Sequence, residues 1–135
     1  MKERVRIDIP SHPKYLSVVR DVTERLGTVY GMDRKLRGDI KLAIDEACSN
    51  VIKHSYKGDT SKKIRLIYEI NGELFKVIID DSGVKADIKS LKGRNLDDVR
   101  PGGLGIHFIR KIFDVFRLDE TKKRGNRLVL IKYLH

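Results

Sequence analysis

A β-hairpin around the dipeptide Asn71-Gly72 is the strongest structural signal in the sequence. Apolar residues recur at every second position from Ile64 to Ile70, and a second apolar run extends from Leu74 to Ile79. Alternation with a period of two is typical of a strand with one buried face. Asn-Gly favours the tight turn of a two-residue hairpin loop. The two runs are therefore predicted to be antiparallel neighbours in a sheet.

Helical periodicity precedes this hairpin. Apolar residues recur every three or four positions from Lys14 to Gly31, and again from about Asp33 to Gly58, where the glycine is placed to end the helix. An initial strand, residues 5–9, comes before the first helix and has the alternation of a half-buried strand. The second helix is predicted to bury a stripe made of Leu36, Ile40, Ala43, Ile44, Ala47 and Val51.

The rest of the chain adds a loop, a helix and two strands. Asp80 to Gly103 is rich in glycine and charge and is predicted to be a long loop. Ile106 to Phe113 has the apolar spacing of a short helix, while Val115 to Leu118 and Arg127 to Tyr133 are predicted to be strands. Hairpin-joined strands with helices collected between them indicate an α+β fold. We expect a two-layer α/β sandwich whose mixed, mainly antiparallel sheet carries helices on one face.

Length and composition fit such a fold. The 135 residues favour one domain, 1–135, and no apolar run approaches the roughly 20 residues of a membrane-spanning helix. The N-terminal residues lack the apolar stretch of a secretion signal, so we expect a cytoplasmic location and no membrane contact. The single cysteine, Cys48, falls within the second helix and is expected to be a core residue rather than a nucleophile.

The formal net charge of +10 raises the question of nucleic-acid binding. Basic residues are spread along the chain and interleaved with acids, and the densest run, Lys122-Lys123-Arg124, lies in a predicted turn. The sequence has no zinc-finger spacing, no aromatic stacking platform and no recognition-helix signature. We therefore expect a solvated basic surface, which would attract an acidic protein or help to hold phosphates, and no direct nucleic-acid partner.

The first candidate site feature is the pair Glu46 and Asn50 on the second helix. A spacing of four residues puts both side chains on one helix face, beside the apolar stripe. The Asn carbonyl oxygen is a suitable ligand for Mg²⁺ that also carries phosphate oxygens and waters. Glu46 would accept a proton from water or from a substrate hydroxyl. Glu and Asn at this spacing are also a common helix-surface pair, so the pair alone is not specific.

Asp81-Ser82-Gly83, directly after an apolar strand, is the second feature. A carboxylate at the end of a strand can accept a hydrogen bond from an exocyclic amino group such as that of adenine. Gly83 would let the backbone approach a flat base closely. Asp-Ser-Gly is equally an ordinary turn sequence. Asp80 makes the register ambiguous, and the Asp-x-Gly spacing selects Asp81 as the candidate.

A glycine-rich stretch before the last predicted helix is the third feature: Arg100-Pro101-Gly102-Gly103-Leu104-Gly105. Glycines free backbone N–H groups to wrap an anion, and the following helix directs its positive N-terminus at the same point. Arg100 would give a charge-assisted hydrogen bond to a terminal phosphate. The stretch is not a Walker loop, because no Gly-Lys-Ser/Thr follows the glycines. Alternatively, the glycines only turn a flexible loop into the helix.

In this order, Glu46-x-x-x-Asn50, Asp81-x-Gly83 and Gly103-x-Gly105 resemble the N, G1 and G2 boxes of the ATPase superfamily of gyrase, heat-shock chaperones and histidine kinases. Within it, the chain is most similar to the anti-sigma-factor serine/threonine kinases. The stretches that carry this likeness are residues 42–50, 100–106 and 125–128. The resemblance covers nearly the whole chain and implies the Bergerat fold, a left-handed βαβ sandwich that binds ATP between a helical layer and a lid.

The resemblance also implies roles for individual residues. Asn50 would coordinate Mg²⁺, Asp81 would recognise the adenine amino group, and Glu46 would be the general base for a serine hydroxyl. Lys53, one turn past Asn50, would reach a phosphate, although a solvated lysine at the helix end is the alternative. The set expected to bind nucleotide is Asn50, Lys53, Asp81, Gly83, Arg100, Gly102, Gly103, Leu104 and Gly105.

Three positions depart from the pattern of this family. Lys85 stands where many relatives have a glycine, which predicts a less mobile loop beside the base. Asn126 stands where others carry threonine, so we expect a hydroxyl contact to phosphate to be missing or replaced. Pro101 stands where some relatives carry arginine, which leaves Arg100 one residue out of register. These differences weaken the expectation of efficient phosphotransfer more than that of ATP binding.

Three functions are compatible with the sequence, and the first of them is the one that we expect. The first is a kinase that uses ATP and Mg²⁺, binds a sigma factor and phosphorylates an anti-anti-sigma protein of the STAS type on serine. The second is a non-catalytic, ATP-sensing anti-sigma module, which keeps the nucleotide pocket but needs no working base. The third is a nucleic-acid binder, for which the net charge is the one argument. Members of the family often dimerise, so a homodimer is an open expectation.

Overall fold

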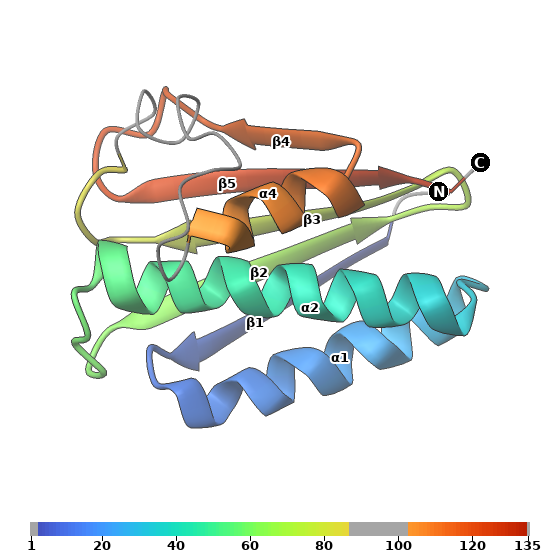
Figure 1. Cartoon of the computed structure of the whole chain (residues 1–135), viewed down its shortest axis with the longest axis horizontal. Helices are drawn as coiled ribbons and strands as arrows, with labels where there is room; N and C mark the ends of the chain where they lie inside the picture. The colour runs from blue at the N-terminus through green and yellow to red at the C-terminus, as the bar shows by residue number, and fades with distance from the viewer. Residues whose placement is uncertain (1–2, 87–102, 135) are drawn as a thin grey trace.

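A five-stranded sheet forms one layer of the protein in the computed structural model, which describes residues 3–86 and 103–134 (Figure 1). The strand order is β1-β2-β3-β5-β4, and all four described pairings are antiparallel. This confirms the predicted, mainly antiparallel sheet. The strands are β1 (Glu3–Pro10), β2 (Lys63–Ile70), β3 (Leu74–Asp81), β4 (Val115–Leu118) and β5 (Asn126–Tyr133).

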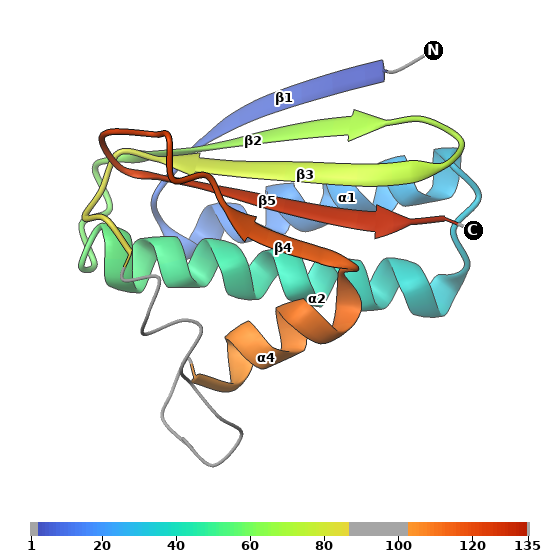
Figure 2. The same ribbon diagram turned by 90° about the horizontal axis from the view of Figure 1, so that it is seen from above.

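The helices form the second layer, on one face of this sheet (Figure 2). After a 3₁₀ turn at Pro13–Tyr15, α1 runs over Leu16–Val29 and packs beside α2 (Arg34–Asn50). The side chain of Asp33 caps α2 by accepting a hydrogen bond from the backbone N–H of Leu36 (2.8 Å), as expected for an N-cap aspartate. At its other end α2 continues into a π-helical turn, η2 (Val51–Ser55).

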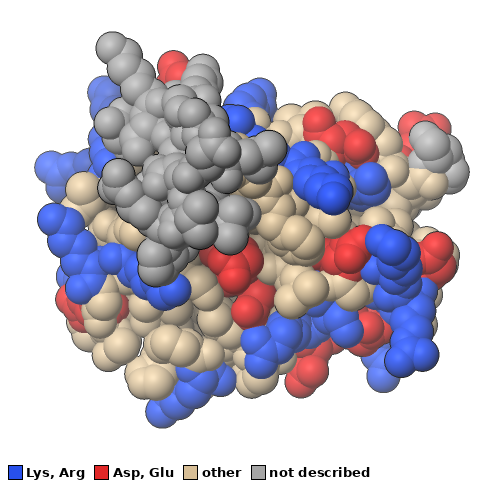
Figure 3. Space-filling view, viewed as in Figure 1, with Lys and Arg blue, Asp and Glu red and all other residues tan. Residues whose placement is uncertain are grey.

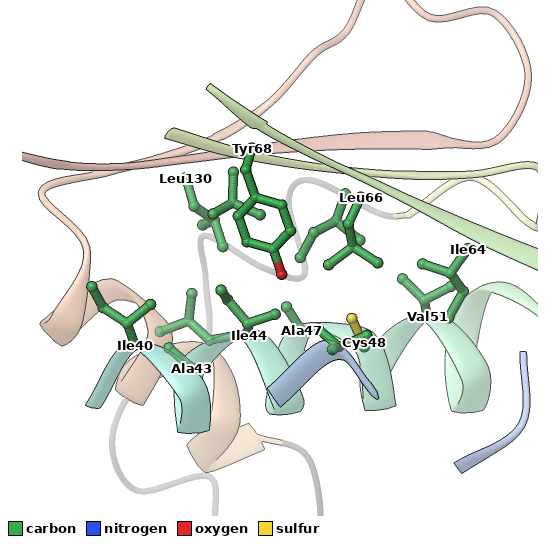
Figure 4. Close-up of a cluster of buried hydrophobic side chains, with 14 of the residues drawn as sticks. Ile40, Ala43, Ile44, Ala47, Cys48, Val51, Ile64, Leu66, Tyr68 and Leu130 are labelled. Carbon is green, nitrogen blue, oxygen red and sulfur yellow. The ribbon is translucent and has the colours of Figure 1, made fainter. Parts of the chain in front are cut away.

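The core lies between α2 and the sheet (Figure 4). The predicted stripe of α2 is confirmed: Ile40, Ala43 and Ile44 are at most 1% exposed and meet the apolar side chains of β2 and β5. Each fully buried isoleucine of this kind contributes about 1.5–3 kcal/mol through burial. Cys48 is also a core residue, as predicted, and burial raises the pKa of its thiol to about 12.

Two boundaries of the predicted long loop need correction. Asp80 and Asp81 belong to β3, where they pair with Arg127 and Asn126 of β5. The last helix, α4 (Gly103–Ile112), begins three residues before the predicted Ile106. Glycine favours turns, so the sequence predicts a loop here, but its cost in a helix is only about 1 kcal/mol relative to alanine and tertiary packing can override it. Gly103 and Gly105 therefore lie in the first turn of α4.

Charged side chains of both signs are mixed on the face that carries the helices (Figure 3). Glu24 accepts from Arg37 (2.6 Å) and Lys41 (2.7 Å), and Asp45 accepts from Arg20 (2.6 Å). Arg20, Arg37 and Lys41 are therefore each paired with a carboxylate on this face. Within the described residues, no helix combines the length and the apolar character needed to cross a bilayer.

Candidate functional site

A cavity of about 260 Å³ lies between the sheet and the helices α2 and α4. It falls just below the range of about 300–1,000 Å³ that is typical of pockets for whole small molecules. A cavity of this size would enclose part of a nucleotide, such as its base. Its walls are mostly apolar and come from α2, η2, β3, β4, β5 and α4, and the residues are Ala47, Asn50, Val51, His54, Ser55, Ile79, Asp81, Val84, Lys85, Ala86, Ile106, Ile109, Phe116, Leu118, Asn126 and Leu128.

Asn50 and Asp81 line this same cavity, although they come from a helix and a strand far apart in the sequence. Asn50 is the last residue of α2, and Asp81 is the last residue of β3. The structure therefore unites two of the three stretches singled out in the sequence. A carboxamide and a carboxylate in the wall of an apolar cavity supply a few oriented polar groups, which is the usual construction of a small-molecule site.

Glu46 lies one helical turn before Asn50 and faces the first turn of α4. A Cβ atom placed on Gly105 would stand 2.5 Å from Glu46 Oε2, so the carboxylate rests directly against that glycine. The third stretch is thereby brought to the same side of α2 as the other two. Glu46 itself does not line the cavity. Its contact with Gly105 places it beside the cavity, at the end of the site that lies toward α4.

Asp81, not Asp80, is the carboxylate at the cavity. Asp81 is 4% exposed, and its Oδ1 accepts a hydrogen bond from the backbone N–H of Gly83 (2.9 Å). Asp80 points away from the helices, because alternate residues of a strand face opposite sides of the sheet. Its carboxylate pairs with Lys122 and with Arg127 (3.4 Å). The register selected from the Asp-x-Gly spacing thus agrees with the geometry.

Gly83 is required by a contact with the protein itself. A Cβ atom at this position would lie 2.3 Å from the backbone carbonyl oxygen of Ser55. The next residue, Val84, donates its backbone N–H to that same oxygen (2.8 Å). In the structure, Gly83 lets the loop pack against the end of η2, while its predicted role in the approach of a flat base stays a prediction.

At Asn126 the sequence predicts that a hydroxyl contact to phosphate is missing or replaced. The Asn126 side chain is 7% exposed and donates to Asp81 Oδ1 (3.1 Å) and Oδ2 (3.3 Å). Gly125 explains how β5 comes so close: it has φ +71°, and a Cβ there would be 2.0 Å from the carbonyl oxygen of Asp81. Asn126 therefore belongs to the Asp81 end of the cavity.

Several predicted residues are not brought to the cavity or cannot be placed. Lys53 is exposed and does not line the cavity, whereas His54 and Ser55 of the same π-helical turn do. Arg100 and Gly102 lie outside the described residues. Gly103 and Leu104 belong to the first turn of α4, but their side chains are outside the described part of the chain.

Most of the cavity wall was not predicted from the sequence as part of a site, including His54, Ser55, Phe116 and Leu118. His54 carried a usable signal, since it lies four residues after Asn50, as Asn50 does after Glu46. Phe116 and Leu118 carried none beyond their strand periodicity. The Phe116 ring is also covered by the Arg110 guanidinium, 4.9 Å from the ring centroid, which stabilises that wall.

A purine nucleotide with Mg²⁺ fits the donor set of this site. The cavity offers apolar walls for a flat ring and a buried carboxylate for an amino group. Within residues 3–86 and 103–134, no cluster of three or more His, Cys, Asp or Glu side chains could hold a metal by itself. Mg²⁺ suits such a site, because it commonly takes one or two protein ligands and completes its shell with phosphates and waters.

Comparisons with known proteins point the same way. The serine-protein kinase RsbW of Listeria innocua is 28% identical over 143 residues, which cover 100% of this chain and 90% of the relative. RsbW of Bacillus cereus is 25% identical over 144 residues, covering 98% and 86%.

Two solved structures share the fold. The RsbU and RsbW domains of a Mycobacterium tuberculosis protein match with a TM-score of 0.68 and 16% identity over 96% of this chain and 31% of that chain. The SiaB–SiaC complex of Pseudomonas aeruginosa matches with a TM-score of 0.63 and 14% identity over 96% and 88%. The profile of one family matches residues 9–132, nearly the whole chain, and the chain therefore belongs to the histidine kinase-like ATPase domain family.

Proposed function

We propose that this protein is an ATP-dependent protein serine/threonine kinase of the anti-sigma type. The observation that carries the proposal is the convergence of Asn50 and Asp81 on one apolar cavity, with Glu46 packed against Gly105 beside it. Family membership and the likeness to RsbW kinases of Listeria innocua and Bacillus cereus support the same activity. The domain that performs it is residues 1–135.

In the proposed reaction, the serine oxygen of a partner protein attacks the terminal phosphorus of ATP, and the bond from that phosphorus to the ADP oxygen breaks. Glu46 accepts the proton that the serine hydroxyl releases, which is the usual work of a positioned carboxylate. Asp81 holds the base through its amino group, while the apolar walls exclude water from the ring. Backbone N–H groups of the first turn of α4, from Gly103 to Gly105, bind the phosphates at the positive end of the helix.

Mg²⁺ would be held by Asn50 and would neutralise charge on the phosphates of the substrate. We further propose that the partners are a sigma factor and an anti-anti-sigma protein of the STAS type, in the cytoplasm. A homodimer remains part of the proposal.

Calorimetric titration with ADP and Mg²⁺ tests the binding half of the proposal. Asp81→Asn should weaken ADP binding about tenfold or more, because a charged acceptor for the amino group is lost. Asp80→Asn is the matched control. The Asp80 carboxylate faces the opposite side of the sheet from Asp81, so the affinity for ADP should stay within about threefold of that of the unchanged protein. Equal losses in both variants, or no binding by the unchanged protein, would contradict the proposed site.

Transfer of labelled phosphate to candidate anti-anti-sigma proteins tests the catalytic half. A kinase transfers the label to serine, whereas a non-catalytic ATP-sensing module binds ADP with the same residues and transfers none. A protein that binds nucleotide and changes its affinity for a partner without any transfer would therefore replace the kinase with the second function.

A further inference from the structure

The residues that hold Asp81 in place form a network centred on Asn126. The Asn126 side-chain oxygen accepts the backbone N–H of Ala86 (2.7 Å), and its nitrogen donates to the carbonyl oxygen of Val84 (2.9 Å). A backbone N–H can only donate and a carbonyl can only accept, so these two bonds fix which way the amide points. The nitrogen of Asn126 must then face Asp81.

The same two bonds fasten the loop of residues 82–86 to β5. The loop has a second attachment, because the Val84 N–H donates to the Ser55 carbonyl (2.8 Å) at the end of η2. A third attachment is the bond from the Lys85 ammonium to the carbonyl oxygen of Lys122. The N–H groups of Val84 and Ala86 and the carbonyl oxygen of Val84 are thus paired within the protein, in the conformation that lines the cavity.

Asp81 has unequal oxygens as a result. Oδ1 accepts two hydrogen bonds, from Gly83 N–H (2.9 Å) and from Asn126 (3.1 Å), while Oδ2 has the longer Asn126 contact at 3.3 Å. A carboxylate oxygen accepts about two hydrogen bonds. Oδ1 is therefore saturated, and Oδ2 keeps acceptor capacity for a donor that enters the cavity.

Asn126 also has more acceptors than hydrogens. Its nitrogen carries two hydrogens, but Val84 O, both oxygens of Asp81 and Ser55 Oγ (3.2 Å) all lie within reach. When a ligand amino group takes Oδ2, the Asn126 nitrogen can keep Val84 O and Oδ1 without losing a bond. The two hydrogens of the Asn126 amide therefore both stay bonded when the ligand binds.

We propose that Asn126 is a positioning residue for base selection: it clamps the 82–86 loop in its ligand-ready form and turns Oδ2 of Asp81 toward a purine that carries an exocyclic amino group. The selection part rests on the proposed nucleotide binding. The clamp is a property of the protein without ligand, so the two parts can fail separately.

The test compares the affinities of the full chain for ADP and for purine riboside 5′-diphosphate, which has no amino group on the ring. The unchanged protein should prefer ADP about tenfold or more. Asn126→Ala should reduce this preference to within about threefold by weakening ADP binding alone. The matched control is Asn71→Ala, which removes another asparagine that accepts backbone N–H groups (2.8 and 3.0 Å) but lies at the remote β2–β3 turn, and it should keep the preference.

Asn126→Thr separates selection from the clamp. Its hydroxyl can still donate to Asp81, so the preference for ADP should be retained. The hydroxyl cannot also bridge Val84 and Ala86, so hydrogen exchange of the Ala86 amide should accelerate about tenfold or more in the absence of nucleotide.

The outcomes are distinct. A preference for ADP that survives Asn126→Ala overturns the positioning role, and an Ala86 exchange rate that Asn126→Thr leaves unchanged overturns the clamp. If Asn126→Ala does not fold, as judged by circular dichroism, Asn126→Val takes its place, because valine also lacks the amide but leaves a smaller cavity: an ADP preference that survives in this variant overturns the positioning role. Failure of the unchanged protein to bind ADP removes the proposed function, while the exchange measurement still tests the clamp.

Discussion

The two ends of the candidate site are built around glycines in different ways. At the Asp81 end, a Cβ on Gly83 would meet the Ser55 carbonyl at 2.3 Å, and one on Gly125 would meet the Asp81 carbonyl at 2.0 Å. At the other end, a Cβ on Gly105 would meet the Glu46 carboxylate at 2.5 Å. Backbone cannot move aside, but the tip of a glutamate can. The Asp81 end is therefore a fixed wall, whereas the Glu46 end can adjust.

The largest expected effect concerns the adjustable end. Glu46→Ala should lower phosphotransfer about 10²–10⁴-fold, the usual contribution of a general base, while ADP affinity stays within about threefold. Radiolabel transfer under single-turnover conditions measures the rate of phosphotransfer, and calorimetry measures the affinity for ADP. Asp45→Ala, which removes the neighbouring carboxylate that pairs with Arg20 (2.6 Å), should keep full transfer. Normal transfer in Glu46→Ala would show that Glu46 is not the base.

The fixed wall should respond through stability. Gly125→Ala combines a positive φ of +71° with a Cβ 2.0 Å from the Asp81 carbonyl. We expect the free energy of unfolding to fall by about 2–4 kcal/mol, because strain and a backbone clash add. Denaturant titration followed by circular dichroism measures this change. A loss below about 0.5 kcal/mol would mean that β5 can retreat from Asp81 and that the wall is not fixed.

Much of the fold followed from periodicity alone. The strands at residues 64–70 and 115–118 and the buried stripe of α2 were predictable, because one face of each is apolar. The start of α4 was not, since Gly103 and Gly105 have loop-like propensity and are helical through their position in a first turn. Residue propensities alone do not predict that these glycines are helical, because the tertiary context decides it.

The site was predictable where spacing determines a shared face. The shared face of Glu46 and Asn50 follows from their spacing of one helical turn. The proximity of Asp81 and Gly83 follows from their separation by a single residue. The contact of Lys53 with a phosphate stays a prediction: Lys53 is exposed and lies outside the cavity wall, whereas His54 lines it at the next position of the 46, 50, 54 spacing. The role of Asn126 depends on the pairing Asp81↔Asn126 between strands 45 residues apart, which no local pattern reveals.

A smaller effect tests the adjustable end without removing its carboxylate. Gly105→Ala would push against the tip of Glu46, which can rotate away, so the free energy of unfolding should change by less than about 1 kcal/mol. Displacing the base should still slow phosphotransfer about tenfold, since a shift of about 1 Å is costly in catalysis. A large loss of stability in thermal melts, comparable to that of Gly125→Ala, would show that Glu46 is held as rigidly as the backbone wall.

The smallest effect comes from a glycine that belongs to neither end. Gly38 lies within α2, its φ is not positive, and a Cβ there would meet nothing within 4 Å outside the helix itself. Gly38→Ala should therefore raise the free energy of unfolding by about 0.5–1 kcal/mol, the difference in helix propensity. Denaturant midpoints measure it, and transfer and ADP affinity should not change. Destabilisation here would mean that α2 tolerates added atoms poorly throughout, and the effect of Gly105→Ala, which presses on Glu46 of the same helix, would then say nothing specific about the adjustable end of the site.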